Sequence, residues 1–195
     1  MDKTMSRRDF VKTVGVSVLV VGLGGGLYAA EHEEVFLRPP GMISEAEFLA
    51  KCIKCQKCLA VCPPRVIVPV SMSEGSMALM TPTMNFSRGY CDLCMKCAEV
   101  CPTQALQPVK PQTVKIGLAR INPDVCVAWS WGGCIECSAA CPYDAIYLDS
   151  HQRPFVDAAK CNGCGRCENI CPSGALRAYS DRKGSKGITV VPFKS

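Results

Sequence analysis

The chain has 195 residues, of which 16 are cysteine and 16 glycine, so an ordinary apolar core cannot by itself hold it together. Its net charge of +5 and aromatic content of 7% argue against a nucleic-acid interface, which needs a clustered basic face interleaved with aromatic side chains. Cysteine usage this high is typical of a disulfide scaffold or a metal protein, and the spacing of the cysteines distinguishes the two.

Residues 1–30 resemble a twin-arginine export signal. The sequence S-R-R-D-F-V-K at positions 6–12 is followed by an apolar, glycine-bearing stretch from Val14 to Ala30. A membrane anchor is the alternative, because these 17 residues lie at the lower edge of the length that spans a bilayer. Tyr28 also makes cleavage after Ala30 unfavourable. We therefore expect passage through the twin-arginine translocase and a periplasmic location, and leave open whether the segment stays attached as an N-terminal anchor.

Residues 31–51 are predicted to form a linker and a short helix. The stretch L-R-P-P-G at positions 37–41 cannot be helical, because two prolines and a glycine interrupt it. Ser44 and Glu47 then fit a capping box, in which each side chain accepts a backbone N–H of the other residue. This pattern predicts a short helix that leads to the first cysteine.

Residues 52–180 hold all sixteen cysteines, in four groups of four, and a proline follows the last cysteine of every group. Groups one, two and four read C-x-x-C-x-x-C-x-x-x-C, the signature of bacterial ferredoxins. Three cysteines at this spacing can direct their thiolates at three irons of a cubane, and the fourth thiolate must come from elsewhere. We therefore predict four [4Fe-4S] clusters. The predicted iron ligands are Cys52, Cys55, Cys58 and Cys62 in group one, Cys91, Cys94, Cys97 and Cys101 in group two, Cys126, Cys134, Cys137 and Cys141 in group three, and Cys161, Cys164, Cys167 and Cys171 in group four.

Other roles for these cysteines fit the spacing less well. Cysteines three apart in repeated triplets compete for disulfide partners, and structural zinc sites use two separated C-x-x-C pairs rather than triplets. Covalent haem needs C-x-x-C-H, and no C-x-x-C run here is followed by histidine. The alternative left open is that one group holds a three-iron cluster or none.

Group three has seven residues between its first two cysteines, and this insertion contains both tryptophans, Trp129 and Trp131. Gly132 and Gly133 permit the insertion to loop out and return. Two interpretations stay open: a docking surface for a partner, or aromatic side chains that simply cover apolar surface.

Two other segments carry weaker predictions. Met77, Met80 and Met84 share one face if their segment is helical, which favours core packing. Residues 181–195 read as a polar, glycine-bearing C-terminal tail that crosses the surface.

With the export signal, the L-R-P-P-G stretch and the four cysteine groups, the chain resembles the NapG/MauM ferredoxin-type family. The resemblance implies electron transfer from a membrane polyferredoxin or quinol dehydrogenase component to a periplasmic reductase or cytochrome, as in a nitrate-reductase-like system. The compact second group departs from the nitrate-reductase members. Similar exported four-cluster subunits imply a nested pairing, with Cys52, Cys55 and Cys58 beside Cys171, and Cys91, Cys94 and Cys97 beside Cys141; pairing of neighbouring groups stays open.

We therefore expect an α+β protein of two ferredoxin-like halves, with short helices and hairpins around four cubane clusters. The expected role is an electron-carrier subunit without catalytic residues of its own, because the sequence offers no nucleophile with a base and no glycine-rich nucleotide loop. The alternatives are an iron–sulfur enzyme with an open iron site and a maturation factor for an exported metalloenzyme.

Overall fold

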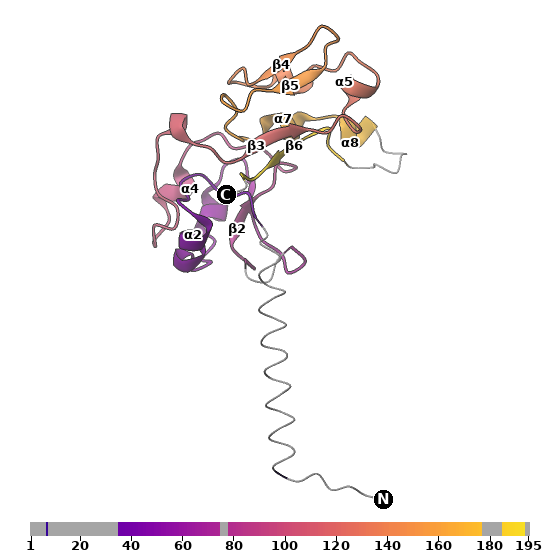
Figure 1. The fold of residues 1–195 in the computed structure, drawn as a ribbon. Helices are drawn as coiled ribbons and strands as arrows, with labels where there is room; N and C mark the ends of the chain where they lie inside the picture. The colour runs from indigo at the N-terminus through magenta and orange to yellow at the C-terminus, as the bar shows by residue number, and fades with distance from the viewer. Residues whose placement is uncertain (1–6, 8–34, 75–77, 177–184, 194–195) are drawn as a thin grey trace, which may run out of the picture. The chain divides into compact units, whose positions relative to one another are not determined.

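Short elements connected by tight loops characterise the computed structural model, which describes residues 7, 35–74, 78–176 and 185–193. The predicted export segment lies outside the described residues except for Arg7. Among the described residues, no helix has the length and hydrophobicity that crossing a bilayer requires. The helices are α2 (Glu45–Lys51), α3 (Lys57–Val61), α4 (Lys96–Glu99), α5 (Val127–Ser130), α6 (Glu136–Ala139), α7 (Arg166–Ile170) and α8 (Ser173–Leu176), with a 3-10 turn η1 (Pro111–Thr113). The strands are β1 (Ile67–Pro69), β2 (Pro82–Met84), β3 (Leu118–Ile121), β4 (Ile146–Leu148), β5 (Pro154–Val156) and β6 (Ile188–Val191) (Figure 1).

The strands form three antiparallel pairs. Strands β1 and β2 form a hairpin between cysteine groups one and two, with Ile67 opposite Met84. Strands β4 and β5 form a hairpin between groups three and four. The third pair joins β3 to β6, which is distant in sequence, and lies between the two hairpins (Figure 1). Two spacers therefore fold back on themselves, and the spacer between groups two and three does not.

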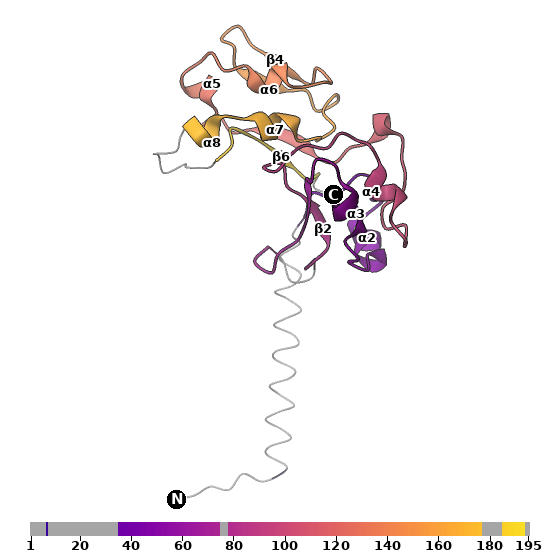
Figure 2. The same cartoon turned by 180° about the vertical axis from the view of Figure 1, so that it is seen from behind.

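The helices that follow the second cysteine of each group pack in pairs. Helix α3 contacts α4, and α6 contacts α7. Figure 2 shows both pairs, one on each side of strand β6. The chain from Phe36 to Ser195 nevertheless forms one compact unit. The coarse prediction of an α+β arrangement with short helices and hairpins is confirmed.

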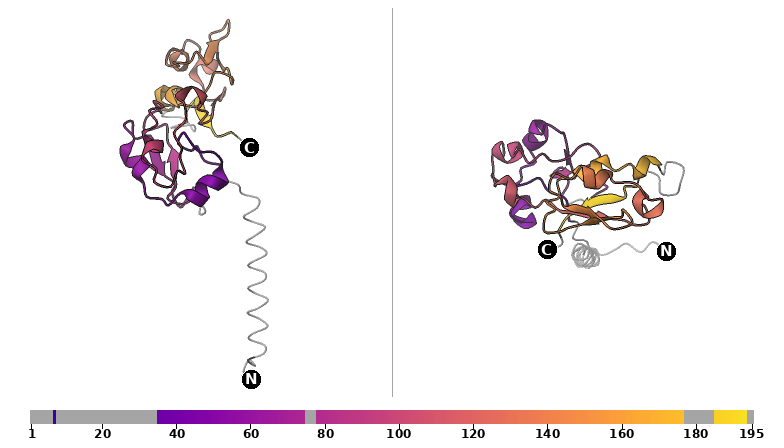
Figure 3. Two further views of the ribbon diagram at one scale, coloured as in Figure 1. Left: turned by 90° about the vertical axis from the view of Figure 1, so that its left-hand side faces the viewer. Right: turned by 90° about the horizontal axis from the view of Figure 1, so that it is seen from above.

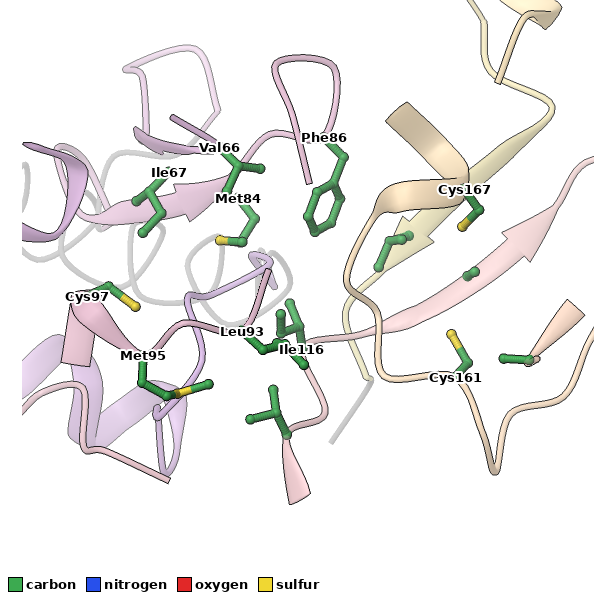
Figure 4. Close-up of a cluster of buried hydrophobic side chains, with 14 of the residues drawn as sticks. Val66, Ile67, Met84, Phe86, Leu93, Met95, Cys97, Ile116, Cys161 and Cys167 are labelled. Atoms are coloured by element: carbon green, nitrogen blue, oxygen red, sulfur yellow. The ribbon is translucent and has the colours of Figure 1, made fainter. Parts of the chain in front are cut away.

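The core contains cysteines among its apolar side chains. Phe86 is buried between Val66 and Met84 on one side and Cys167 on the other (Figure 4). The predicted helical face of methionines is wrong for the two that the structure describes. Met84 lies in strand β2, and Met80 lies in a turn with a left-handed backbone, φ +66°. Met77 lies outside the described residues.

The predicted surface tail is partly wrong, because strand β6 belongs to the core. Ile188 and Val190 are buried, and Val190 N–H donates to the Glu168 carboxylate at 2.6 Å. The alternation of buried and exposed residues in β6 is that of a half-buried strand. This strand has only four residues and follows a polar segment, so the sequence alone did not predict it.

The L-R-P-P-G stretch forms a buried polar anchor. Arg38 is 3% exposed, pairs with the Glu45 carboxylate, and donates to Thr81 Oγ1 and the Pro82 carbonyl, each at 2.8 Å. Its guanidinium also lies 4.8 Å from the centre of the Phe48 ring. Gly41 has φ +97°, where L side chains are strained. The stretch thus fastens helix α2, which Ser44 caps by accepting Glu47 N–H at 3.2 Å, to strand β2.

Replacing Arg38 with methionine is expected to lower stability by about 3–5 kcal/mol, because Glu45 and the Pro82 carbonyl lose their buried partner. The apparent midpoint of anaerobic thermal unfolding should fall by roughly 10 °C. Lys51→Met is the control, since Lys51 pairs with Glu47 on the exposed side of the same helix, where such a pair contributes about 0.3–0.5 kcal/mol. Equal midpoints for the two variants would show that the buried pair is not an anchor.

Candidate metal centres

The cysteine loops of groups one, two and four share one backbone pattern. In each loop the residues just before and just after the second cysteine are left-handed. Two such reversals within five residues turn the chain around a point, so that the three thiols face the same side. Four of these residues are not glycine and carry backbone strain, which is typical of ligand clamps. The left-handed pairs are Lys54 and Gln56, Leu93 and Met95, and Gly163 and Gly165.

The last cysteine of each of the first three groups is followed by a second shared turn. The residue three positions later is left-handed: Arg65, Gln104 and Asp144. This turn aims backbone N–H groups at the preceding sulfur. Ala145 N–H donates to Cys141 Sγ at 3.4 Å. At Cys101, burial raises the pKa of the thiol, but N–H groups led by that of Leu106 more than offset this and lower the pKa, which favours the thiolate.

The first two groups exchange their last cysteines. Cys101 lines the same hollow as Cys52, Cys55 and Cys58, together with Phe48 and Pro82. Cys62 lies close to Cys91, and Cys91 and Cys94 lie close to Cys97. These sets are called here the first quartet (Cys52, Cys55, Cys58, Cys101) and the second quartet (Cys62, Cys91, Cys94, Cys97).

The last two groups make the same exchange. Cys171 lines one hollow with the first three cysteines of group three, and Cys141 lines another with the first three of group four. Gly187 N–H, just before strand β6, donates to Cys171 Sγ at 3.3 Å. These sets are called the third quartet (Cys126, Cys134, Cys137, Cys171) and the fourth quartet (Cys141, Cys161, Cys164, Cys167).

The expected nested pairing is wrong, and neighbouring groups pair instead. Cys171 lies beside Cys126, Cys134 and Cys137, not beside group one. The spacers explain this outcome, because the β1–β2 hairpin returns group two to group one and the β4–β5 hairpin returns group four to group three. Figure 3 shows the indigo-to-magenta part of Phe36–Ser195 on one side and the orange-to-yellow part on the other.

The four quartets suit a cluster better than a single ion. All sixteen thiols are free. Within residues 35–74, 78–176 and 185–193, no set of three or more histidine, cysteine or acidic side chains is arranged to hold one metal ion. Thiolates around one ion lie about 4 Å apart, given metal–sulfur distances of about 2.3 Å. A cubane carries its irons at separate corners and spaces its thiolates more widely.

The electrostatics of the quartets also favour a positively charged metal group bound between the thiols. Burial, together with a smaller contribution from neighbouring thiolates, raises the pKa of Cys58 to about 11 and that of Cys97 to about 12. Burial, followed by the charges of Cys126, Cys134 and Cys171, raises the pKa of Cys137 to about 12. Four thiolates can therefore share such a space only when bound metal neutralises them.

The quartets follow one another in the order first, second, fourth, third. Cys58 and Cys97 interact electrostatically across the first and second quartets, and Cys137 and Cys167 do so across the third and fourth. Cys91 N–H donates to the Cys164 carbonyl at 2.8 Å, which joins the second quartet to the fourth. The spatial order therefore differs from the order along the chain.

A close-packed junction supports the link between the second and fourth quartets. The Asn169 side-chain amide donates to the Phe86 carbonyl at 2.9 Å, and the Arg166 guanidinium lies 4.1 Å from the centre of the Tyr90 ring. A Cβ atom at Gly165 would lie 2.0 Å from the Phe86 ring. Figure 4 shows Phe86 near Cys167, which lies two residues after Gly165. Only glycine fits between this loop and Phe86.

Gly165→Ala is expected to force the two quartets apart and to weaken the magnetic interaction between their reduced clusters in EPR spectra. Gly132→Ala is a matched control, because both glycines have φ +81° and a Cβ at Gly132 meets nothing within 4 Å. The control should show only the cost of a left-handed alanine, about 1–2 kcal/mol. Identical EPR spectra and thermal stability for the two variants would argue against a tight junction.

The two tryptophans of the insertion in group three differ in exposure, and Trp129 fits the interpretation of an aromatic side chain that covers apolar surface. Trp129 is partly buried, packs edge-on against Phe155 at 5.5 Å between ring centres, and lies under Arg153 at 5.1 Å. It covers the β4–β5 hairpin. Trp131 is 66% exposed.

Several residues that shape the sites carried no usable sequence signal. Phe86 and Gly187 act through contacts with segments at least 16 residues away. The glycines of group four and the proline after each group were the available hints. Lys54, Gln56, Leu93 and Met95 gave none, because residues of these types rarely adopt left-handed backbones.

Comparison with known proteins agrees with this geometry. A model described as a 4Fe-4S dicluster domain matches residues 51–105, 90–145 and 132–175. Ferredoxin-type protein NapG of Escherichia coli is 31% identical, with 92% of this chain and 87% of that protein aligned. Methylamine utilization ferredoxin-type protein MauM of Methylorubrum extorquens is 34% identical, with 95% and 94% aligned. The chain belongs to the NapG/MauM ferredoxin-type family. Ferredoxin-type protein NapF of E. coli is 30% identical over 73% of this chain.

Within this NapG/MauM-type chain, the structure distinguishes among the three dicluster matches. The matches to residues 51–105 and 132–175 each enclose one exchanged pair of groups. The match to residues 90–145 spans groups two and three, which exchange no cysteine. The chain is thus a ferredoxin-type electron-transfer protein with repeated 4Fe-4S domains.

Proposed function

We propose that the four quartets bind four [4Fe-4S] clusters and that the protein passes electrons along them in the order first, second, fourth, third. The observation that carries this proposal is the direct contact between successive quartets, above all the hydrogen bond from Cys91 to Cys164. The clusters supply one-electron oxidation and reduction. The chain holds their thiolates, donates N–H groups to sulfur and leaves every cysteine except Cys55 and Cys94 at least partly buried.

On either side of the second cysteine, the loops at the two ends of this line are exposed and those in the middle are buried, although Cys94 itself is exposed. The residues flanking the second cysteine are exposed in the first quartet, at Lys54 and Gln56, and in the third, at Gly133 and Ile135. The equivalent residues of the second and fourth quartets are buried. Electrons therefore enter and leave through the first and third quartets.

The proposed arrangement is two ferredoxin-like halves joined end to end. The first holds groups one and two with helices α3 and α4, and the second holds groups three and four with α6 and α7. Each half repeats the same exchange of last cysteines. Such a protein needs no catalytic residue, and its substrates are the redox partners at its two ends.

The proposed partners and location follow from the family and the N-terminal sequence. One relative is named a ferredoxin-type protein and the other a methylamine utilization ferredoxin-type protein. We place this chain in the periplasm, exported by the twin-arginine route, between a membrane quinol-linked component and a periplasmic oxidoreductase. Arg7→Lys with Arg8→Lys should abolish export, as tested by cell fractionation. Unchanged periplasmic protein would rule this route out.

A redox-poised EPR titration of anaerobically purified protein tests the relay. Stepwise reduction should give cluster signals that broaden as neighbouring clusters become reduced together. Non-interacting signals throughout the titration would contradict a continuous line. A three-iron signal in the intact protein would favour the iron–sulfur enzyme instead.

A further inference from the structure

The loop of the first quartet is the most exposed of the four cysteine loops. All of residues 53–57 are exposed, including Cys55 itself. Ile53 is 64% exposed although it is apolar. At the equivalent places in the second quartet, Leu93 and Met95 are buried in the core. The residues that flank the second cysteine are thus buried in the second quartet and exposed in the first.

The exposed loop also carries unmatched positive charge. On helix α2, just before it, Glu45 pairs with Arg38 and Glu47 pairs with Lys51. Lys54 and Lys57 have no carboxylate partner among the described residues. Both lysines are exposed and flank Cys55 in the sequence. The exposed loop of the first quartet is therefore basic and also carries the exposed apolar side chain of Ile53.

The other loops lack this combination. In the second quartet, Lys96 occupies the helix position of Lys57, but exposed Asp92 and Glu99 lie in the same segment. In the third quartet the equivalent residue is Glu136. In the fourth, Arg166 packs on Tyr90. Unmatched positive charge at an exposed cysteine loop is thus a property of the first quartet.

We propose that the Ile53–Lys57 loop docks a redox protein with an acidic surface, which exchanges electrons with the first quartet; this rests on the proposed relay. A basic loop with one exposed apolar side chain suits transient association, in which charge steers the encounter. The partner brings carboxylates to Lys54 and Lys57 and places its redox group over Cys55. One electron passes in each encounter, and the donor is oxidised as the first cluster is reduced.

The test is a calorimetric titration of the oxidised full-length holoprotein with a flavodoxin that has an acidic face around its flavin. At about 0.01 M salt, where charges act over about 30 Å, the wild type should bind, and at about 1 M salt binding should vanish. Lys54→Gln with Lys57→Gln should weaken binding about tenfold, and arginine at both positions should restore it. Lys96→Gln is the matched control and should change binding less than twofold.

Four outcomes would overturn the docking proposal: no binding at low salt, binding that is insensitive to salt, equal losses in the Lys96 and Lys54/Lys57 variants, or equally tight binding of a basic cytochrome c. Iron content and EPR spectra of each variant must match the wild type, which excludes loss of the cluster as a cause. Failure of the relay itself would appear separately, as clusters that dithionite cannot reduce in sequence.

Discussion

Alanine at both Cys55 and Cys101 is expected to remove no more iron than alanine at either position alone. Both thiols belong to the first quartet, so each single variant and the double variant lose the same cluster, about four irons per chain. Cys55→Ala combined with Cys171→Ala should lose about eight, because Cys171 belongs to the third quartet. Iron per chain in anaerobically purified protein measures the difference.

The two double variants are matched, since each removes one loop cysteine and one last cysteine. Nested pairing predicts the reverse, with the smaller loss for Cys55 and Cys171 and the larger for Cys55 and Cys101. Circular dichroism of both variants checks that the remaining chain stays folded. The reversed result would refute the exchange of cysteines between neighbouring groups.

Ile188→Asp is expected to remove the cluster of the third quartet while leaving the first and second intact. Ile188 is buried, pairs with Ile121 across strands β6 and β3, and lines the hollow that contains Cys171. A carboxylate there has no partner and repels four thiolates, so strand β6 should detach and Gly187 should lose its hydrogen bond to Cys171. Iron should fall by about four per chain, or by about eight if the fourth quartet follows.

Thr189→Asp is the control for this prediction, because Thr189 lies on the same strand with its side chain exposed. It should retain full iron content and EPR signals. Full iron content in Ile188→Asp would mean that β6 does not support the third quartet. A loss of first-quartet signals would mean that the two halves do not hold their clusters separately.

The local sequence predicted local structure well where one residue determines it. Ser44 caps helix α2 as expected, although Glu47 turns to Lys51 and does not complete the capping box. The cysteine spacing predicted loops that gather three thiols, because only two residues separate successive ligands and leave few alternatives. The α+β arrangement of short elements was predicted from the repeated ferredoxin-type groups, because the segments that follow such groups in ferredoxins are short helical turns and strands.

The pairing of the cysteine groups could not be predicted from the sequence, because the triplets of groups one, two and four are identical in spacing. Which group supplies the fourth thiol depends on where each spacer turns, and the β1–β2 hairpin has little turn signal of its own. Strand β6 was missed for a related reason, since its partner β3 lies about 70 residues away in the chain. Met84 was misread because a spacing of four fits both a helix face and alternate positions of a strand.

The measurement that tests the central claim most directly is the iron and acid-labile sulfide content of the anaerobically purified full-length protein. Four occupied quartets predict about sixteen irons and sixteen sulfides per chain, four of each for every quartet. A content of about twelve irons or fewer would show that at least one quartet does not hold a complete cluster, and would contradict an unbroken line from the first quartet to the third.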